Sequence, residues 1–516
     1  MEEIGLSRTE NTGKNVVWQI GASLLTIGLG LISRYVFNKV LGADYLGLSS
    51  LFASVLSVLS FADLGIANSF TFCLYKPIAQ NNQGYICVLL ATFKKIMRAI
   101  MISILVLGLC FSPFLRYVVK ESQQFTELQL QFYYFLSLAE ILVSYLCTYK
   151  VCYVSACQKQ YKLVPIRMWG SVITLVLKLG AVVLTHSYTI YVLTGTLVVV
   201  LQQLVTNWYI TKKFPVVRQL QEGELTQEDR RAIKRNIKAG LINKFAQISV
   251  TQTDSIIISA ALSIGTLGRI TNYVTLKTYI FNIISQVQTS AHASMGDVVA
   301  TESKEKQLDI FYRFLLVSQL LISGAVCGLL VLTTPIVVWV FGPTWKVDYL
   351  STVLMVSAAA IVQHTYALNI LPTANGRLDV VAKLAFVEGA VNLAASLIAI
   401  KLIGLPGVYL GTVIAELAYY ILTPLKVFPT LYQCGAKRYF IRTLYGMAVT
   451  AIQVAVLLAI QGHIINNQYC FSNIIILCVC IIAVFSGGTY LAWHRDRYFK
   501  ELCAMAAQLL RKVLKK

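Results

Sequence analysis

The chain has 516 residues, of which 57% are hydrophobic and only 13% are charged, and its formal net charge is +21. Ordinary soluble domains carry about 25% charged residues. The low charged fraction and the mean hydropathy of +0.68 therefore exclude such a domain. The composition predicts an all-α polytopic membrane protein.

Fourteen apolar runs follow one another along the chain, and each reaches the roughly 20 residues that a helix needs to cross a bilayer. They cover residues 16–38, 45–72, 86–112, 128–156, 163–185, 189–211, 236–262, 268–295, 310–341, 349–371, 379–402, 406–428, 439–462 and 471–493. The first six predict an N-terminal lobe over 1–211, the next six a C-terminal lobe over 239–430, and the last two a pair of additional helices within 431–494.

Two hydrophilic segments separate or follow these runs. Residues 212–238 are predicted to form a cytoplasmic linker between the lobes, and within it Thr226 and Asp229 have the spacing of a helix capping box. Residues 495–516 alternate leucines with lysines and arginines, which predicts a basic amphipathic helix on the cytoplasmic membrane surface.

The two lobes look like copies of one six-helix unit. Short landmarks recur in the same order at an offset of about 220 positions, which indicates an internal repeat. Leu46-Gly47 returns as Leu267-Gly268, Phe93 as Phe311, Pro113 as Pro335, Ala156 as Ala374, Ile190-Tyr191 as Val408-Tyr409, and KKFP as KVFP. Since six spans return the chain to the same side, the repeats are predicted to be parallel about an axis normal to the membrane. Such duplication is typical of alternating access.

Basic residues set the predicted orientation. Most of the 44 Lys and Arg residues lie in the linker, the tail and the loops on their side, and the opposite loops hold few. Those few are Lys39, Arg116, Lys120, Arg269, Lys346 and Lys401. This bias places both termini in the cytoplasm. The same bias accounts for the positive net charge, because anionic membrane lipids attract the basic side of the protein. We therefore expect no nucleic-acid partner.

No signature of catalysis or metal binding stands out. The sequence has no P-loop and no HExxH motif, and its five histidines lie far apart. The twelve cysteines fall mostly within spans, where they are expected to pack. We therefore expect a protein that is not an enzyme and that holds no cofactor and no metal.

Charged residues within the spans are the strongest functional signal, because each is costly near the bilayer centre. The candidates for a substrate-binding cavity are Arg34, Lys244, Asp254, Arg269, Tyr273 and Lys277. At 100° per residue they fall on polar stripes of the first, seventh and eighth runs. These stripes predict a water-filled cavity between the lobes with net positive charge, which suits a phosphate or pyrophosphate.

A structural alternative is that Arg34 and Asp254 pair across the lobe interface and hold it shut. Further charges form a secondary set of candidates: Asp63, Glu140, Lys178, Glu388 and Glu416. Of these, Lys178 and Glu388 lie off the stripes and are expected to matter less.

Three stretches carry a resemblance to a known family. They are LGADYLGLSSLFASVLSVLSFADLGIANSF at 41–70, GRITNYVTLKTYIFNIISQVQTSAHASMGDVVATESKEK at 268–306, and PTANGRLDVV at 372–381. The chain resembles the polysaccharide and O-antigen flippases of the multidrug/oligosaccharidyl-lipid/polysaccharide exporter superfamily. The resemblance implies two six-helix lobes in a V, with two further helices. In related lipid II flippases, cationic residues on the first and eighth helices line the cavity, and Arg34, Arg269 and Lys277 occupy those helices here.

The resemblance also implies a function: export of an undecaprenyl-pyrophosphate-linked oligosaccharide to the outer face of the bacterial plasma membrane by alternating access, for surface polysaccharide assembly. Its expected partners are this lipid-linked anionic glycan, membrane lipids and polysaccharide assembly proteins. The membrane potential, Na⁺ or H⁺ would drive transport, with Asp254 or Glu416 as coupling carboxylates. Two alternatives stay open: a cation-coupled multidrug antiporter of the same superfamily, and a membrane-embedded polysaccharide polymerase or ligase.

Overall fold

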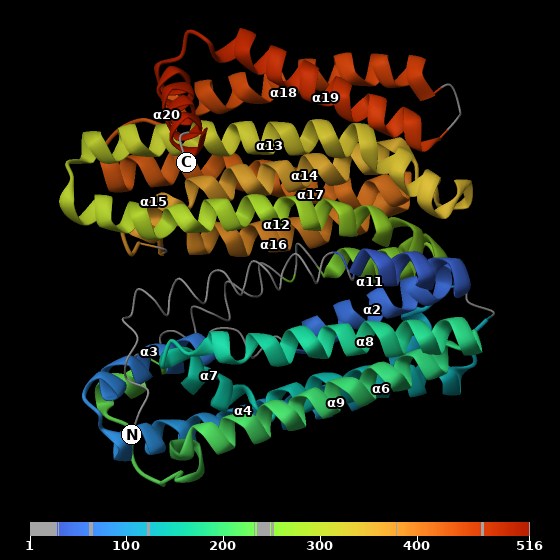
Figure 1. Ribbon diagram of the computed structural model, residues 1–516, viewed down its shortest axis with the longest axis vertical. Coiled ribbons are helices and arrows are strands. Elements are labelled where there is room, and N and C mark those ends of the chain that lie inside the picture. The colour runs from blue at the N-terminus through green and yellow to red at the C-terminus, as the bar shows by residue number, and fades with distance from the viewer. Residues whose placement is uncertain are drawn as a thin grey trace. The chain divides into compact units, whose positions relative to one another are not determined.

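The computed structural model describes residues 28, 30–60, 66–120, 124–231, 233–234, 248, 252–377, 379–465 and 469–514. Every regular element within these ranges is a helix (Figure 1). Nine of the described helices are long and apolar enough to cross a membrane, and the number is ten if the bent pair α6 (Glu127–Tyr145) and α7 (Thr148–Ala156) forms one span. The prediction of an all-α polytopic membrane protein is therefore confirmed.

The chain divides into two compact units, residues 1–268 and 269–516. The division lies in the first turns of α12 (Ile264–Thr301). The lobe and linker boundaries expected from the sequence, at 211, 239 and 430, remain predictions.

The first unit begins in its described part with a helical segment at residues 30–40. Its further elements are α2 (Ala43–Leu59), α3 (Ile66–Ala79), α4 (Gln83–Phe111), η2 (Ser112–Phe114), α5 (Leu115–Val118), α6, α7, η3 (Gln160–Lys162), α8 (Val164–Thr185), α9 (Tyr188–Lys213), η4 (Pro215–Arg218) and α11 (Thr253–Ala261). Most of the expected spans 16–38 and 236–262 falls outside the described residues. The expected span 128–156 bends by 41° at the break between α6 and α7.

Close helix contacts in the first unit depend on glycine and aromatic residues. A Cβ on Gly108 of α4 would overlap Leu138 of α6, and the Tyr134 hydroxyl donates to the Gly108 carbonyl at 3.1 Å. Likewise a Cβ on Gly47 of α2 or on Gly268 of α12 would overlap the backbone of the other helix. Small residues thus let helix backbones approach within a bilayer. Gly47 and Gly268 are also corresponding positions of the predicted repeat.

Thr226 caps a helical turn, which confirms one half of the predicted capping box. The backbone N–H of Asp229 donates to Thr226 Oγ1 at 3.2 Å, which satisfies a free donor of the helical turn that begins there. The backbone N–H of Thr226 in turn donates to the Tyr85 hydroxyl at 3.1 Å. The segment after α9 is therefore held to the start of α4.

The second unit contains most of α12 and all later elements. These are α13 (Lys304–Phe341), η5 (Pro343–Trp345), α14 (Tyr349–Leu368), α15 (Ile370–Ala374), α16 (Asp379–Ile403), α17 (Leu405–Val427), the π-helical turn η6 (Phe428–Tyr432), α18 (Lys437–Ile465), α19 (Phe471–Trp493) and α20 (Arg497–Leu514). The two additional helices expected within 431–494 correspond to α18 and α19. The predicted tail helix is α20, whose apolar and charged residues separate at helical spacing.

Polar contacts fasten the tail helix to the body of the second unit. The Tyr498 hydroxyl donates to Asp309 of α13 at 2.7 Å, and Arg313 of α13 lies 2.8 Å from Glu501. Arg442 of α18 donates to Asp496, just before α20, at 2.9 Å. Burial and the hydrogen bond to Asp309 both raise the pKa of Tyr498, so it stays a neutral donor at physiological pH.

Candidate functional site

The structure describes most, but not all, of the predicted site residues. Asp63 and Lys244 lie outside the described residues. Asp254 is half-buried in the first turn of α11. Arg269 and Lys277 are half-buried on α12, two turns apart, as their spacing predicts. That these residues line one cavity stays a prediction.

Tyr273 is more deeply buried than its two charged neighbours. It lies between Arg269 and Lys277 along the same face of α12, but its side chain is fully buried. Its hydroxyl accepts a hydrogen bond from the backbone N–H of Val347 at 3.2 Å. The ring therefore packs inside the second unit, and a role for Tyr273 in the cavity stays a prediction.

In the first unit, charged residues from three helices gather around Tyr191 of α9. The Lys178 ammonium of α8 lies 4.7 Å from the centre of the Tyr191 ring, a cation–π contact. Arg34, in the segment 30–40, lies close enough for its charge to act on the Tyr191 phenol. Glu140 of α6 also acts on this phenol and accepts a hydrogen bond from Thr196 at 2.7 Å. We call Arg34, Glu140, Lys178, Tyr191 and Thr196 the Tyr191 cluster.

A glycine makes the Tyr191 cluster possible. A Cβ on Gly195, one turn after Tyr191, would overlap the end of the Lys178 side chain. The absence of a side chain at Gly195 therefore leaves the space in which the Lys178 side chain reaches from α8 to α9. Two cations and one carboxylate give the cluster a positive balance. Lys178 and Arg34 thus act on the same tyrosine, and the expectation that Lys178 matters less stays a prediction.

In the second unit, α16 and α17 form an antiparallel seam built on small residues. A Cβ on Gly407 of α17 would overlap the backbone of Ala399, and one on Gly411 would overlap Ser396 of α16. The Ser396 hydroxyl donates to the Val408 carbonyl at 3.0 Å. These contacts bring the two helices close together over two turns.

The same seam brings two carboxylates together. Glu416 lies one turn beyond Gly411 and is only 2% exposed, and it is within hydrogen-bonding reach of Glu388 on α16. Asn392, one turn from Glu388, is fully buried, and neither polar atom of its side chain has a hydrogen-bond partner among the described residues. Two buried carboxylates at this separation repel strongly unless a proton or a cation lies between them. We call Glu388, Asn392 and Glu416 the carboxylate pair site.

Sequence reasoning included both glutamates as secondary candidates but omitted Asn392. Two signals in the sequence indicate this site. Glu388 and Asn392 stand four apart within an apolar run, so they share a helix face. Gly407 and Gly411 form a GxxxG motif, which is typical of close helix packing in membranes.

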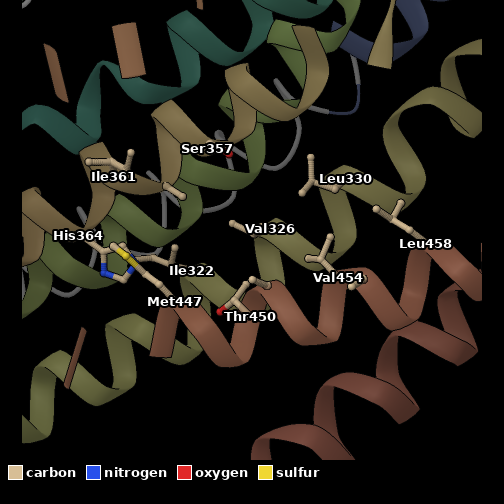
Figure 2. A pocket seen from close by; sticks show the side chains of 13 residues that line it. Ile322, Val326, Leu330, Ser357, Ile361, His364, Met447, Thr450, Val454 and Leu458 are labelled. Atoms are coloured by element: carbon tan, nitrogen blue, oxygen red, sulfur yellow. The ribbon is translucent and has the colours of Figure 1, made fainter. Parts of the chain in front are cut away.

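A third feature of the second unit is an apolar cavity of about 410 Å³ between α13, α14 and α18. Figure 2 shows the side chains that surround it, with Ile322, Val326 and Leu330 on α13, Ser357, Ile361 and His364 on α14, and Met447, Thr450, Val454 and Leu458 on α18. Three of these side chains are polar, and of them His364 is only 2% exposed. A cavity of this size and lining suits an apolar chain.

Comparison with known proteins identifies the fold of this chain but no sequence family. No family model matches the sequence, and no curated protein matches it. The structure of the lipid II flippase MurJ in an inward closed conformation matches with a TM-score of 0.69 at 12% identity, covering 93% of this chain and 99% of MurJ. An inward-facing multidrug resistance MATE family transporter of the MOP superfamily matches with a TM-score of 0.60 at 12% identity, covering 83% of this chain and 95% of that one.

A eukaryotic MATE transporter, AtDTX14, matches with a TM-score of 0.59 at 12% identity, covering 84% of this chain and 99% of its own. The chain therefore has the fold that MurJ and the MATE transporters share. It is a multi-pass membrane protein.

Proposed function

We propose that this protein is a flippase that moves an undecaprenyl-pyrophosphate-linked oligosaccharide from the cytoplasmic to the outer face of the bacterial plasma membrane, for surface polysaccharide assembly. The observation that carries the proposal is the apolar cavity that α18 closes against α13 and α14. A lipid-linked cargo needs an apolar path for its polyprenyl chain beside a polar path for its headgroup. A water-soluble cargo needs only the second.

The likeness to solved structures supports the same choice. The fold of the lipid II flippase covers 93% of this chain, whereas the MATE folds cover 83% and 84%. The helices α18 and α19 follow the predicted duplication, and α18 supplies one wall of the apolar cavity.

The cationic residues supply the means to handle the headgroup. Arg34 and Lys178 in the first unit, and Arg269 and Lys277 on α12, are positive charges within the runs that the sequence predicts to span the membrane. Guanidinium and ammonium groups in a low-dielectric site bind phosphate oxygens strongly. In this mechanism the headgroup enters from the cytoplasm, the lobes rock about the repeat axis, and the headgroup is released outside.

Energy for transport has two proposed sources. With the cell interior negative, outward movement of an anion gains about 2.3 kcal/mol per charge per 100 mV. The second source is a gradient of H⁺ or Na⁺ across the membrane. The carboxylate pair site could bind the coupling cation, because Glu388 and Glu416 need a proton or Na⁺ between them whenever they face each other. We propose that this site couples cation entry to the return of the empty transporter.

A second candidate function is a cation-coupled multidrug antiporter, favoured by the carboxylate pair site and by the MATE fold. In that case an organic cation would compete with the coupling cation. The positive balance of the Tyr191 cluster favours an anionic cargo instead. We propose that both termini lie in the cytoplasm, with membrane lipids and polysaccharide assembly proteins as partners.

A cavity-filling pair of variants tests the proposal. Ala455 of α18 lines the apolar cavity, whereas the next residue, Val456, is 45% exposed on the outside of the helix. We expect Ala455→Trp to abolish surface glycan while the lipid-linked precursor accumulates on the cytoplasmic face, and Val456→Trp to display glycan normally. The measurement is surface glycan together with accessibility of the precursor to an external probe.

Each alternative predicts a different result from these variants. Loss of polymer with the precursor still exposed outside indicates a polymerase or ligase. Loss of drug resistance with normal glycan display indicates the antiporter. Normal display from Ala455→Trp at wild-type expression contradicts the lipid path.

A further inference from the structure

The first unit also contains a polar pocket, which is lined by none of the residues of the Tyr191 cluster. It has a volume of about 290 Å³ and opens where α4 and α9 meet the bend between α6 and α7. Its lining residues are Lys94, Met97, Arg98 and Met101 from α4, Tyr145, Leu146, Tyr149 and Lys150 from the bend, and Asn207 from α9. We call it the α4–α7 pocket. The proposed transport mechanism assigns no role to this pocket.

The α4–α7 pocket holds three cations, and its lining residues include no carboxylate. The ammonium groups of Lys94 and Lys150 lie 5.7 Å and 5.8 Å from the centre of the same ring, that of Tyr149. Arg98 is on the same face of α4 as Lys94, one turn further along. Arg218, just after α9, adds a positive charge that acts on Lys150.

Lys150 shows that the positive charge reaches into the protein. Its residue is 8% exposed, and its ammonium donates to Asn207 Oδ1 and to Thr211 Oγ1, at 2.5 and 2.7 Å. Both acceptors are neutral, so they satisfy donors without cancelling the charge. A buried charge is costly unless an opposite charge offsets it. An anion in the pocket, in contact with Lys94 and Arg98, would supply that opposite charge.

The surroundings of the pocket indicate where such an anion comes from. Leu146 in the lining is 53% exposed, and Ile102, one turn beyond Arg98, is 56% exposed. In a membrane-spanning unit these apolar surfaces face hydrocarbon. Trp208, next to Asn207, is 60% exposed, and the Lys212 ammonium lies 4.9 Å from its ring centre. Exposed tryptophan beside lysine is typical of the level of lipid headgroups.

We propose that the α4–α7 pocket binds the phosphate of an anionic phospholipid, with the acyl chains lying along Leu146 and Ile102. Basic pockets between membrane helices are known to hold acidic headgroups on the cytoplasmic side. The Lys94 and Arg98 side chains contact the phosphate, and Lys150 holds the floor of the site at positive potential. The proposal does not depend on the transported cargo.

Lys95 provides a matched control for the loss of charge. It neighbours Lys94 in sequence but points elsewhere, because its ammonium lies 2.7 Å from Glu222 and its side chain is 68% exposed. The Lys95 ammonium lowers the pKa of Glu222, so this pair stays ionised and neutral overall. Lys95→Gln therefore changes the net charge of the protein without changing the pocket.

The experiment measures phosphatidylglycerol bound to the purified full-length protein by native mass spectrometry, after exchange into phosphatidylcholine nanodiscs with and without phosphatidylglycerol. We expect the Lys94→Gln/Arg98→Gln double variant to bind about 30-fold more weakly, since each cation at this level contributes about 1 kcal/mol. The Kd of Lys95→Gln is expected to equal that of the wild type. Met101→Trp fills the pocket at constant charge and is expected to match the double variant.

Three results overturn the proposal. Unchanged binding by Met101→Trp shows that the pocket holds no headgroup, even if the double variant fails to fold. An equal loss in Lys95→Gln shows a response to net charge alone. Displacement of phosphatidylglycerol by inorganic phosphate at equal concentration shows a site for free phosphate rather than for lipid.

Discussion

Replacing Glu416 by glutamine removes one of the two carboxylates that meet on the seam between α16 and α17. The change keeps the size and hydrogen-bonding capacity of the side chain, so the close contacts at Gly407 and Gly411 are expected to survive. What changes is the charge at a position that is only 2% exposed. The Glu416→Gln variant therefore tests whether the carboxylate pair site binds the coupling cation.

The expected size of the effect follows from Coulomb's law for a carboxylate in contact with a cation. Two unit charges about 4 Å apart in a partly screened protein site interact by about 4 kcal/mol. Loss of one carboxylate then weakens cation binding by about a thousandfold, because each 1.4 kcal/mol is about tenfold. Glu388 and the buried amide of Asn392 remain, so we expect weaker binding rather than complete loss.

The assay is the thermal unfolding of purified protein in NaCl and in choline chloride over a range of pH. A cation at about 100 times its Kd stabilises the folded state by about 2.7 kcal/mol, which shifts the Tm by about 5–10 °C for a unit of this size. If the site takes Na⁺, the wild type shows this shift and Glu416→Gln loses it. If it takes a proton, the wild type loses stability as pH rises, because two buried carboxylates then become charged and repel each other, and Glu416→Gln loses less because only Glu388 remains.

Asp379→Asn is the matched control. It removes one negative charge from α16, the helix that carries Glu388, but its side chain is 65% exposed and lies 3.0 Å from Arg377. The control therefore loses an exposed carboxylate that is already paired with a guanidinium. Its Tm is expected to respond to Na⁺ and pH like that of the wild type. A Glu416→Gln variant that keeps the full response to both cations would refute the assignment of the site.

Two further predictions concern the cationic residues. Neutralising Arg34 or Lys277 with glutamine is expected to abolish surface glycan at matched expression, since removing a cation from a low-dielectric site loses about 2–5 kcal/mol of interaction with a buried anion; normal display from both variants contradicts an anion-binding cavity. Gly195→Leu is expected to displace the Lys178 side chain and reduce glycan display, whereas Gly180→Leu, a position with no neighbour within 4 Å, leaves display unchanged; equal display from the two rejects a role for the Tyr191 cluster.

Much of this architecture was predictable from the sequence because the bilayer imposes it. A helix must satisfy its own backbone hydrogen bonds in hydrocarbon, so apolar runs of about 20 residues predict spans directly. The helices α8, α9, α13, α14 and α16 to α19 lie where such runs predict them. The cap at Thr226 and the amphipathic α20 were equally predictable, since each depends on neighbours within four residues.

The bends and breaks were less predictable. The apolar run 128–156 gives no sign of the 41° bend between α6 and α7, yet this bend forms one side of the α4–α7 pocket. The run 45–72 contains the end of α2 and the start of α3. Mean hydropathy reports how favourable it is to transfer a segment into lipid. This free energy is similar for a bent and a straight helix, so hydropathy does not predict the bend.

The partners of each charged residue were decided only by the tertiary structure. Helical periodicity places Lys178 on one face of α8 and Glu416 on one face of α17, but it does not say which helix lies opposite. Lys178 meets Tyr191 because Gly195 leaves room for it, and Glu416 meets Glu388 because Gly407 and Gly411 bring α16 close. The sequence by itself determined which segments enter the membrane and on which face their charges lie. Which charges meet depends on the packing of helix against helix, because side chains distant in sequence become neighbours only there.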